Sequence, residues 1–105
     1  MKLYSILLVC SGGMSTSLLV TKMEKAAEEQ GIEVKVKAIA ETDLQNNLDG
    51  VQAVLLGPQV RYMLTKIKAA TEPKGIPVDV ISSVDYGMMK GENVLKQAIS
   101  MIESK

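Results

Sequence analysis

The sequence predicts an α/β fold: an open, four-stranded parallel sheet in the order 2-1-3-4, with helices on both faces. Short apolar stretches alternate with longer stretches of helical periodicity, which favours parallel strands joined by helical crossovers. The first and third strand candidates are apolar at nearly every position, as central strands covered on both faces would be. The second and fourth carry charges, which suits edge strands. Right-handed connections then give this strand order.

The first half of the chain contains two strand candidates and two helix candidates. Residues 3–9 form the first strand, and residues 16–30 place their apolar side chains on one helical face. Gly31 follows as a C′ glycine, which commonly closes a helix. Residues 32–38 alternate between apolar and charged or polar residues, so one face of this strand is wet. Residues 41–50 are mostly polar and predict a short helix of low stability.

The second half begins with the third strand, residues 51–56, which ends at Gly57-Pro58. Proline suits the first turn of a helix, and a helix with a buried apolar stripe is expected to follow. Proline and glycine at residues 73–77 break the chain before a shorter, charged strand at 78–81. Residues 82–91 predict a loop, and the rest of the chain predicts a last amphipathic helix.

Composition predicts one domain over residues 1–105 and excludes several functions. The chain is near the common size for one core, and its apolar content of 47% is ordinary for a globular protein. Twelve basic residues balance twelve acidic ones, and three tyrosines are the only aromatic residues, so no nucleic acid partner is expected. The absence of histidine removes the usual zinc ligand and general base. No phosphate-loop, dinucleotide or zinc motif is present, so neither a metal nor a cofactor is expected.

The N-terminus resembles an export signal only over a short apolar run. The apolar run after Lys2 has about eight residues, the lower limit for such a signal, and no small-residue cleavage site precedes Cys10. No segment approaches the roughly 20 apolar residues that span a bilayer. The single cysteine forbids an internal disulfide and fits a reducing compartment. We therefore expect a soluble cytoplasmic protein.

The candidate site is the stretch from Val9 to Ser17, between the first strand and the first helix. The connection reverses direction between the first and third strands, and ligands favour the crevice beyond such a switch point. Inward amide groups of a glycine-containing loop and a helix N-terminus favour anions, and the same setting favours a reactive thiolate at Cys10. A lone cysteine after an apolar strand is also often a small buried hydrophobe, and the serines and glycines here also suit helix caps and turns.

Two stretches resemble a known family: LLVCSGGMSTSLLVTKM (Leu7 to Met23) and VLLGPQVRYML (Val54 to Leu64). They are similar to the IIB component of the phosphoenolpyruvate-dependent sugar phosphotransferase system, lactose/cellobiose/chitobiose class, and the likeness covers essentially the whole chain. The resemblance implies that Cys10 accepts a phosphoryl group from a phosphohistidine on the IIA component. Cys10 would then pass it to a sugar bound by the membrane transporter IIC. The implied phosphate-holding loop comprises Ser11, Gly12, Gly13, Met14, Ser15, Thr16 and Ser17.

The same loop resembles that of the low-molecular-weight tyrosine phosphatases, which implies their fold. Those enzymes have a cysteine, five residues, an arginine and a serine, whereas here Thr16 stands in the arginine slot before Ser17. Arginine would bind phosphate through two hydrogen bonds and stabilise the transition state, so its absence disfavours hydrolysis. Asp85 lies in the segment where such phosphatases carry a general acid. A loop aspartate is more often a turn former.

Partner proteins must reach Cys10 closely, so uncharged surface beside it is expected to form the docking face. Met14, Gln59, Arg61 and Tyr62 are the candidates, although solvated residues would follow the same pattern. Two rival functions remain open: a phosphatase or arsenate reductase, and a non-catalytic interaction module in which Cys10 only packs. A reductase of this kind generally needs further cysteines, and the chain has none. A monomer is expected, and the transported sugar is not encoded in this sequence.

Overall fold

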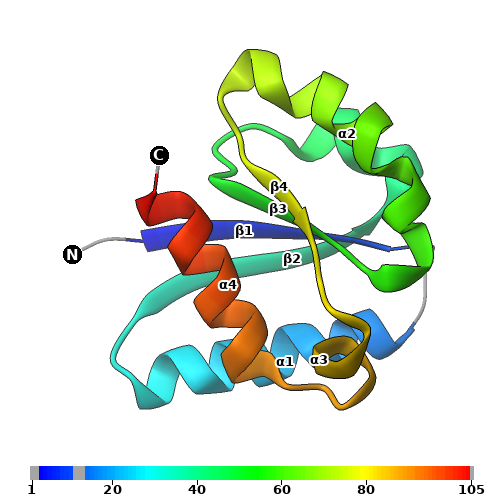
Figure 1. Cartoon of the computed structure of the whole chain (residues 1–105). Helices are drawn as coiled ribbons and strands as arrows, with labels where there is room; N and C mark the ends of the chain where they lie inside the picture. The colour runs from blue at the N-terminus through cyan, green and yellow to red at the C-terminus, as the bar shows by residue number, and fades with distance from the viewer. Residues whose placement is uncertain (1–2, 11–13, 105) are drawn as a thin grey trace.

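The strands form one parallel sheet in the order β2-β1-β3-β4, as the sequence predicts (Figure 1). The structure is a computed structural model that describes residues 3–10 and 14–104, without the side chains of 14–16 and 41. The four strands are β1 (Leu3–Cys10), β2 (Glu33–Ala40), β3 (Ala53–Leu56) and β4 (Val78–Val80).

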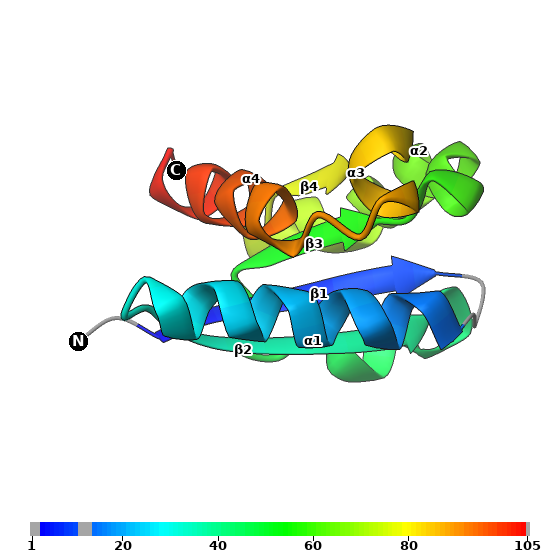
Figure 2. The ribbon, with the colours of Figure 1, turned by 90° about the horizontal axis from the view of Figure 1, so that it is seen from below.

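Helical segments connect the strands and cover both faces of the sheet. In Figure 1, α1 and α2 lie on opposite sides of the strands, and Figure 2 shows α1 running along β1 and β2. The α-helices are α1 (Met14–Glu29), α2 (Leu64–Thr71), α3 (Ser83–Gly87) and α4 (Gly91–Glu103), and the 3₁₀ helices are η1 (Glu41–Asn47), η2 (Pro58–Met63) and η3 (Glu72–Lys74).

The larger buried cluster lies between the sheet and the pair α1 and α4. Alternation along β1 directs Ile6 and Leu8 to this face, where α1 and α4 contribute the helical side of the core. The helical residues recur at spacings of three and four, which gives each helix one apolar stripe. Those stripe residues are Leu19, Met23, Ala26 and Ala27 of α1, and Val94, Leu95 and Ala98 of α4.

The second cluster covers the other face of the sheet, beneath η1, η2 and α2. Leu7 and Val9 of β1 pack there with Val60 and Ile67. All four residues of β3 are buried, as expected for a central strand. At the edge of the sheet, β2 exposes its glutamate and both lysines. The contrast between these strands confirms the basis on which the sequence predicted their order.

The end of α1 confirms the interpretation of Gly31. This glycine has φ +69°, its N–H donates to the carbonyl of Glu28, and the N–H of Ile32 donates to the carbonyl of Ala27. These are the two hydrogen bonds of a Schellman motif. Ile32 then packs against the cluster that contains Ala27, which turns the chain directly into β2.

Segment 82–91 is not a loop throughout, because it contains the short helix α3 and the first residue of α4. Ser82 is the N-cap of α3: its Oγ accepts a hydrogen bond from the N–H of Asp85 at 3.1 Å. The signal was present in the sequence as a serine with an acidic residue three positions later. Segment 41–50 also differs in type, since its helical part is the 3₁₀ helix η1.

Removing the cap of α3 should destabilise this helix. We expect Ser82→Ala to lower the free energy of unfolding by about 1 kcal/mol, because the N–H of Asp85 loses its side-chain acceptor. Urea unfolding followed by circular dichroism measures the change. The neighbouring Ser83→Ala is the matched control, since the exposed Ser83 is not the cap. Equal stabilities of the two variants would show that the cap contributes nothing.

Candidate functional site

The site lies where the chain leaves β1 and β3 at the carboxyl edge of the sheet. These two strands are paired through Val9 and Leu56, and the N–H of Gly57 donates to the carbonyl of Val9 at 2.9 Å. From this point β1 leads to α1 on one face, whereas β3 leads to η2 on the other. The structure therefore has the switch point that the strand order predicts, and Cys10 is the last residue of β1 there.

Cys10, the only cysteine of the chain, is only 3% exposed. It pairs with Ala40 across the strands, and its Sγ lies 3.6 Å from the carbonyl oxygen of Ile39 on β2. A thiol is a weak hydrogen-bond donor, so this contact fits an S–H group directed at that carbonyl. The sulfur is thus covered by protein in this arrangement, next to the end of β2.

The N-terminus of α1 comes directly after Cys10 in the chain. This 16-residue helix begins at Met14, so its unpaired N–H groups and partial positive charge lie at the same edge of the sheet. Of the predicted phosphate-holding loop, Ser11, Gly12 and Gly13 lie outside the described residues, as do the side chains of Met14, Ser15 and Thr16. Ser17 is exposed on α1. Phosphate binding by this loop stays a prediction.

The three docking candidates after β3 lie on η2. Gln59, Arg61 and Tyr62 are exposed, and the side chain of Tyr62 is 77% exposed. Gln59 also contacts another segment, because its Nε2 donates to the hydroxyl of Tyr86 on α3 at 3.1 Å. Their exposure is compatible with docking, which stays a prediction.

Asp85 has a structural contact that its sequence position did not suggest. Its Oδ1 accepts a hydrogen bond from Nδ2 of Asn93 at 3.1 Å, which links α3 to the first turn of α4. The residue is half-buried within α3. Its role as a general acid stays a prediction, and this bond gives it a separate role in fixing α3.

Sequence reasoning missed the contribution of α3 to this edge of the molecule. Val84 and Met88 are 61% and 65% exposed, which is unusual for large apolar side chains at two places so close in the chain. Tyr86, between them, is half-buried and packs against the cluster beneath α1 and α4. The capping pattern that begins at Ser82 could have located this helix, but no local signal pairs Tyr86 with Gln59.

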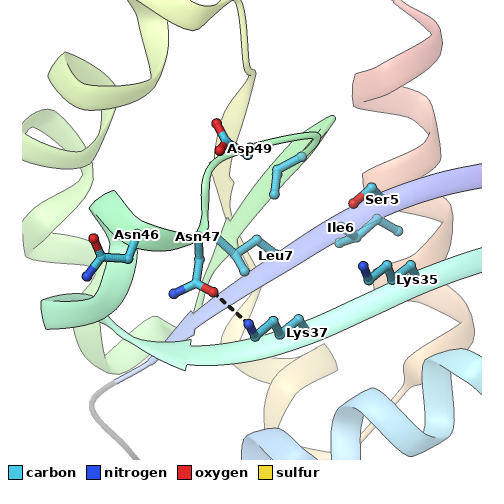
Figure 3. Close-up of a pocket in the computed structure, with 9 residues that line it drawn as sticks. Ser5, Ile6, Leu7, Lys35, Lys37, Asn46, Asn47 and Asp49 are labelled. Atoms are coloured by element: carbon cyan, nitrogen blue, oxygen red, sulfur yellow. Dashed lines mark hydrogen bonds between the residues drawn. The ribbon is translucent and has the colours of Figure 1, made fainter.

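A separate pocket of about 160 Å³ lies along β2, away from Cys10 (Figure 3). Lys37 Nζ donates there to Oδ1 of Asn47 at 2.6 Å. Leu7, the lining residue of β1 that is nearest to Cys10, precedes it by three positions, roughly 10 Å along the strand. The pocket is therefore not part of the candidate site.

Within residues 3–10 and 14–104, no group of three or more acidic, cysteine or histidine side chains is arranged to hold a metal ion. In the same ranges, no helix combines the length and the apolar character that crossing a membrane requires.

Residues 5–97 match the family described as the PTS system, Lactose/Cellobiose specific IIB subunit. The galactose-specific EIIB component of Lactococcus lactis subsp. cremoris is 44% identical over 102 residues, covering 92% of this chain and 94% of that protein. The oligo-beta-mannoside-specific EIIB component of Bacillus subtilis is 38% identical over 97 residues, with the same two coverages. The likeness thus spans nearly the whole length of each protein.

Solved structures agree with the fold. The cellobiose-specific phosphotransferase IIB component from Borrelia burgdorferi is 45% identical, with a TM-score of 0.83 over 99% of this chain and 95% of that one. The lactose-specific IIB domain from Streptococcus pneumoniae, at 19% identity, shares the fold with a TM-score of 0.85 over 95% and 98%. The lactose-specific EIICB component of Streptococcus mutans is 35% identical over 82 residues, 78% of this chain but 14% of that longer protein.

Proposed function

Because the chain belongs to the lactose/cellobiose-specific IIB family of the sugar phosphotransferase system, we propose that Cys10 carries a phosphoryl group during sugar uptake. The donor is the phosphohistidine of a IIA component, and the acceptor is a sugar bound by the membrane transporter IIC. The observation that carries the proposal is the position of the only cysteine, at the carboxyl end of a central strand and with three residues between it and a long helix.

The chemistry consists of two in-line displacements at phosphorus. In the first, the Cys10 thiolate attacks, the phosphorus–nitrogen bond breaks, and its electron pair returns to the donor imidazole. In the second, a sugar hydroxyl attacks and loses its proton to solvent, the phosphorus–sulfur bond breaks and the thiolate leaves with the electron pair of that bond. The positive end of α1 favours the phosphoryl oxygens, which supports a site that needs no metal. The predicted loop from Ser11 to Ser17 would supply the amide groups.

The burial of Cys10 adds one requirement to this mechanism. Cys10 is 3% exposed and its sulfur is directed at the carbonyl of Ile39, so a donor phosphorus has no open path to the sulfur that must attack it. The side chain must therefore leave this carbonyl before transfer. A thiol is a weak donor, so losing this one hydrogen bond costs little.

A carrier suits this site better than a phosphatase. Thr16 occupies the position of the arginine that phosphatases of this loop type use, and the only arginine of the chain, Arg61, is exposed on η2. Without a bidentate arginine to stabilise the transition state, water is a poor acceptor, and the phosphocysteine persists until a sugar arrives.

The donor protein must cover the surroundings of Cys10, because in-line transfer brings the two reacting atoms within bonding distance. We extend the predicted docking face, Met14, Gln59, Arg61 and Tyr62, to the exposed apolar side chains of Val84 and Met88. These side chains are apolar or uncharged apart from Arg61, as a face that must bind and release its partner quickly would be. The longer EIICB relative, which joins a IIB-like segment to further chain, supports IIC as the second partner. The proposal places the protein in the cytoplasm, at the membrane when it meets IIC.

Phosphorylation of the intact protein tests this function. With phosphoenolpyruvate, the general phosphotransferase enzymes and a lactose/cellobiose-class IIA protein, we expect a mass gain of one phosphoryl group, located at Cys10 by fragmentation. The reaction without IIA is the control and should give no gain. We also expect no appreciable hydrolysis of a chromogenic phosphoester. Brisk, Cys10-dependent hydrolysis would favour the phosphatase, and no phosphorylation would favour the interaction module.

A further inference from the structure

Two segments that flank the carboxyl edge of the sheet are joined by one side-chain hydrogen bond. Gln59 of η2 donates through Nε2 to the hydroxyl of Tyr86 on α3 at 3.1 Å, across 27 positions of sequence. The side chain of Tyr86 is held in place by packing, since it contacts the buried cluster under α1 and α4. The bond therefore ties the segment after β3 to a residue anchored on the other face of the sheet.

Gly57 provides the room for this bond. A Cβ on Gly57 would lie 2.6 Å from Oε1 and 3.1 Å from Cδ of Gln59, so the carboxamide lies over the Cα of Gly57. The backbone of Gly57, with φ −62° and ψ 150°, is one that any residue adopts. Glycine thus leaves space above the chain for the carboxamide and is not needed for the backbone conformation.

The carboxamide lies close to the reacting residue. Leu56 pairs with Val9, and the N–H of Gly57 continues the ladder to the Val9 carbonyl, so Gly57 is the next position opposite Cys10. The exposed apolar residues of the docking face come from the same two segments: Tyr62 from η2, and Val84 and Met88 from α3 and its C-cap.

We propose that the Gln59–Tyr86 hydrogen bond is a clasp that holds η2 and α3 in a fixed relative position and so preorganises the surface to which the phosphorylated IIA donor docks. This inference rests on the proposed function. Because α3 has only five residues, its own helical hydrogen bonds hold it weakly. A surface assembled before contact loses less conformational entropy on binding. Tyr86 acts as a positioning residue and Gln59 is both part of the docking face and the donor of the clasp; neither takes part in the bond changes at phosphorus.

Three substitutions break the clasp in three different ways. Tyr86→Phe removes the acceptor and keeps the ring in its packing, Gln59→Met removes the donor, and Gly57→Ala displaces the donor with a new Cβ. The last change is mild, because the new methyl group meets only the end of a flexible side chain. Tyr4→Phe is the matched control, since Tyr4 donates its hydroxyl to Glu103 at the opposite end of β1.

Rates of phosphoryl acceptance from phosphorylated IIA, measured over a range of IIA concentrations, test the clasp. We expect each of the three variants to raise the apparent KM for IIA by about twofold to tenfold, with the rate at saturating IIA within about twofold of wild type. Tyr4→Phe should match wild type. The double variant Tyr86→Phe/Gln59→Met should be no worse than Tyr86→Phe alone, because the bond that Gln59→Met removes is already lost there.

Multiplying effects in the double variant would show that the two residues act separately, which overturns the clasp. An unchanged KM in Tyr86→Phe, with melting showing a folded protein, would overturn it as well. A loss of the saturating rate instead of affinity would assign the pair to the chemical step and contradict the inference. If wild-type protein accepts no phosphoryl group under the same conditions, the proposed function fails first, and the inference with it.

Discussion

Cys10→Ser should accept phosphoryl groups from phosphorylated IIA about a thousandfold more slowly than wild type, or slower still. The serine hydroxyl can still donate to the Ile39 carbonyl that the thiol now faces, so the local structure should persist. The hydroxyl stays protonated at neutral pH and needs a neighbouring base to become a nucleophile. The chain has no histidine to serve as that base. Intact mass spectrometry of timed samples measures the loss.

Thermal melting of Cys10→Ser is the control for folding, and we expect a melting temperature close to that of wild type. In wild-type protein, prior phosphorylation should also protect the thiol from alkylation, because the sulfur is then bonded to phosphorus. Phosphorylation of Cys10→Ser at the wild-type rate would locate the acceptor elsewhere. In that case the 3% exposure of Cys10 would reflect packing alone, as the interaction-module hypothesis holds.

The sheet could be predicted from sequence because burial leaves a direct trace in composition. β3 is buried at every position and is uniformly apolar, whereas β2 at the edge keeps Lys35 and Lys37 in solvent. Cys10 was located at the carboxyl edge by the same reasoning, since the switch point follows from the strand order. These predictions depend on averages over several residues, which single substitutions do not disturb.

Individual pairs of residues at the site could not be predicted, because nothing in local sequence encodes them. Gly57 looks like a turn glycine before a proline, and only its contact with the Gln59 carboxamide shows that its missing Cβ matters. Tyr86 lies in α3, a helix in a segment that the sequence predicts as a loop. The position of its side chain, and therefore its hydrogen bond to Gln59, could not be predicted. The contact of the Cys10 thiol with the Ile39 carbonyl depends on the register of β1 and β2, so it could not be predicted from local sequence either.

The contact made by Gly91 at the interface between α1 and α4 could not be predicted from sequence either. Substitution of this glycine should have a large effect on stability. It is the first residue of α4 and is buried, and an added Cβ would lie 2.5 Å from the carbonyl carbon of Lys22 and 2.7 Å from the N of Met23. These are backbone atoms of α1 that cannot rotate away. We expect Gly91→Ala to lower the free energy of unfolding by about 2–3 kcal/mol and the melting temperature by roughly 10–20 °C.

The cause would be the displacement of α4 from the apolar stripe of α1, which opens the cluster around Met23 and Leu95. Gly87→Ala is the matched control, because an added Cβ at this position of α3 meets nothing within 4 Å and its φ is not positive. Alanine there should leave stability unchanged or raise it by up to about 1 kcal/mol, since it reduces the freedom of the unfolded chain. Melting followed by circular dichroism compares the two variants with wild type. A Gly91→Ala protein as stable as Gly87→Ala would mean that α4 shifts away from α1 at no cost, and the close approach of the two helices would then contribute nothing to the core.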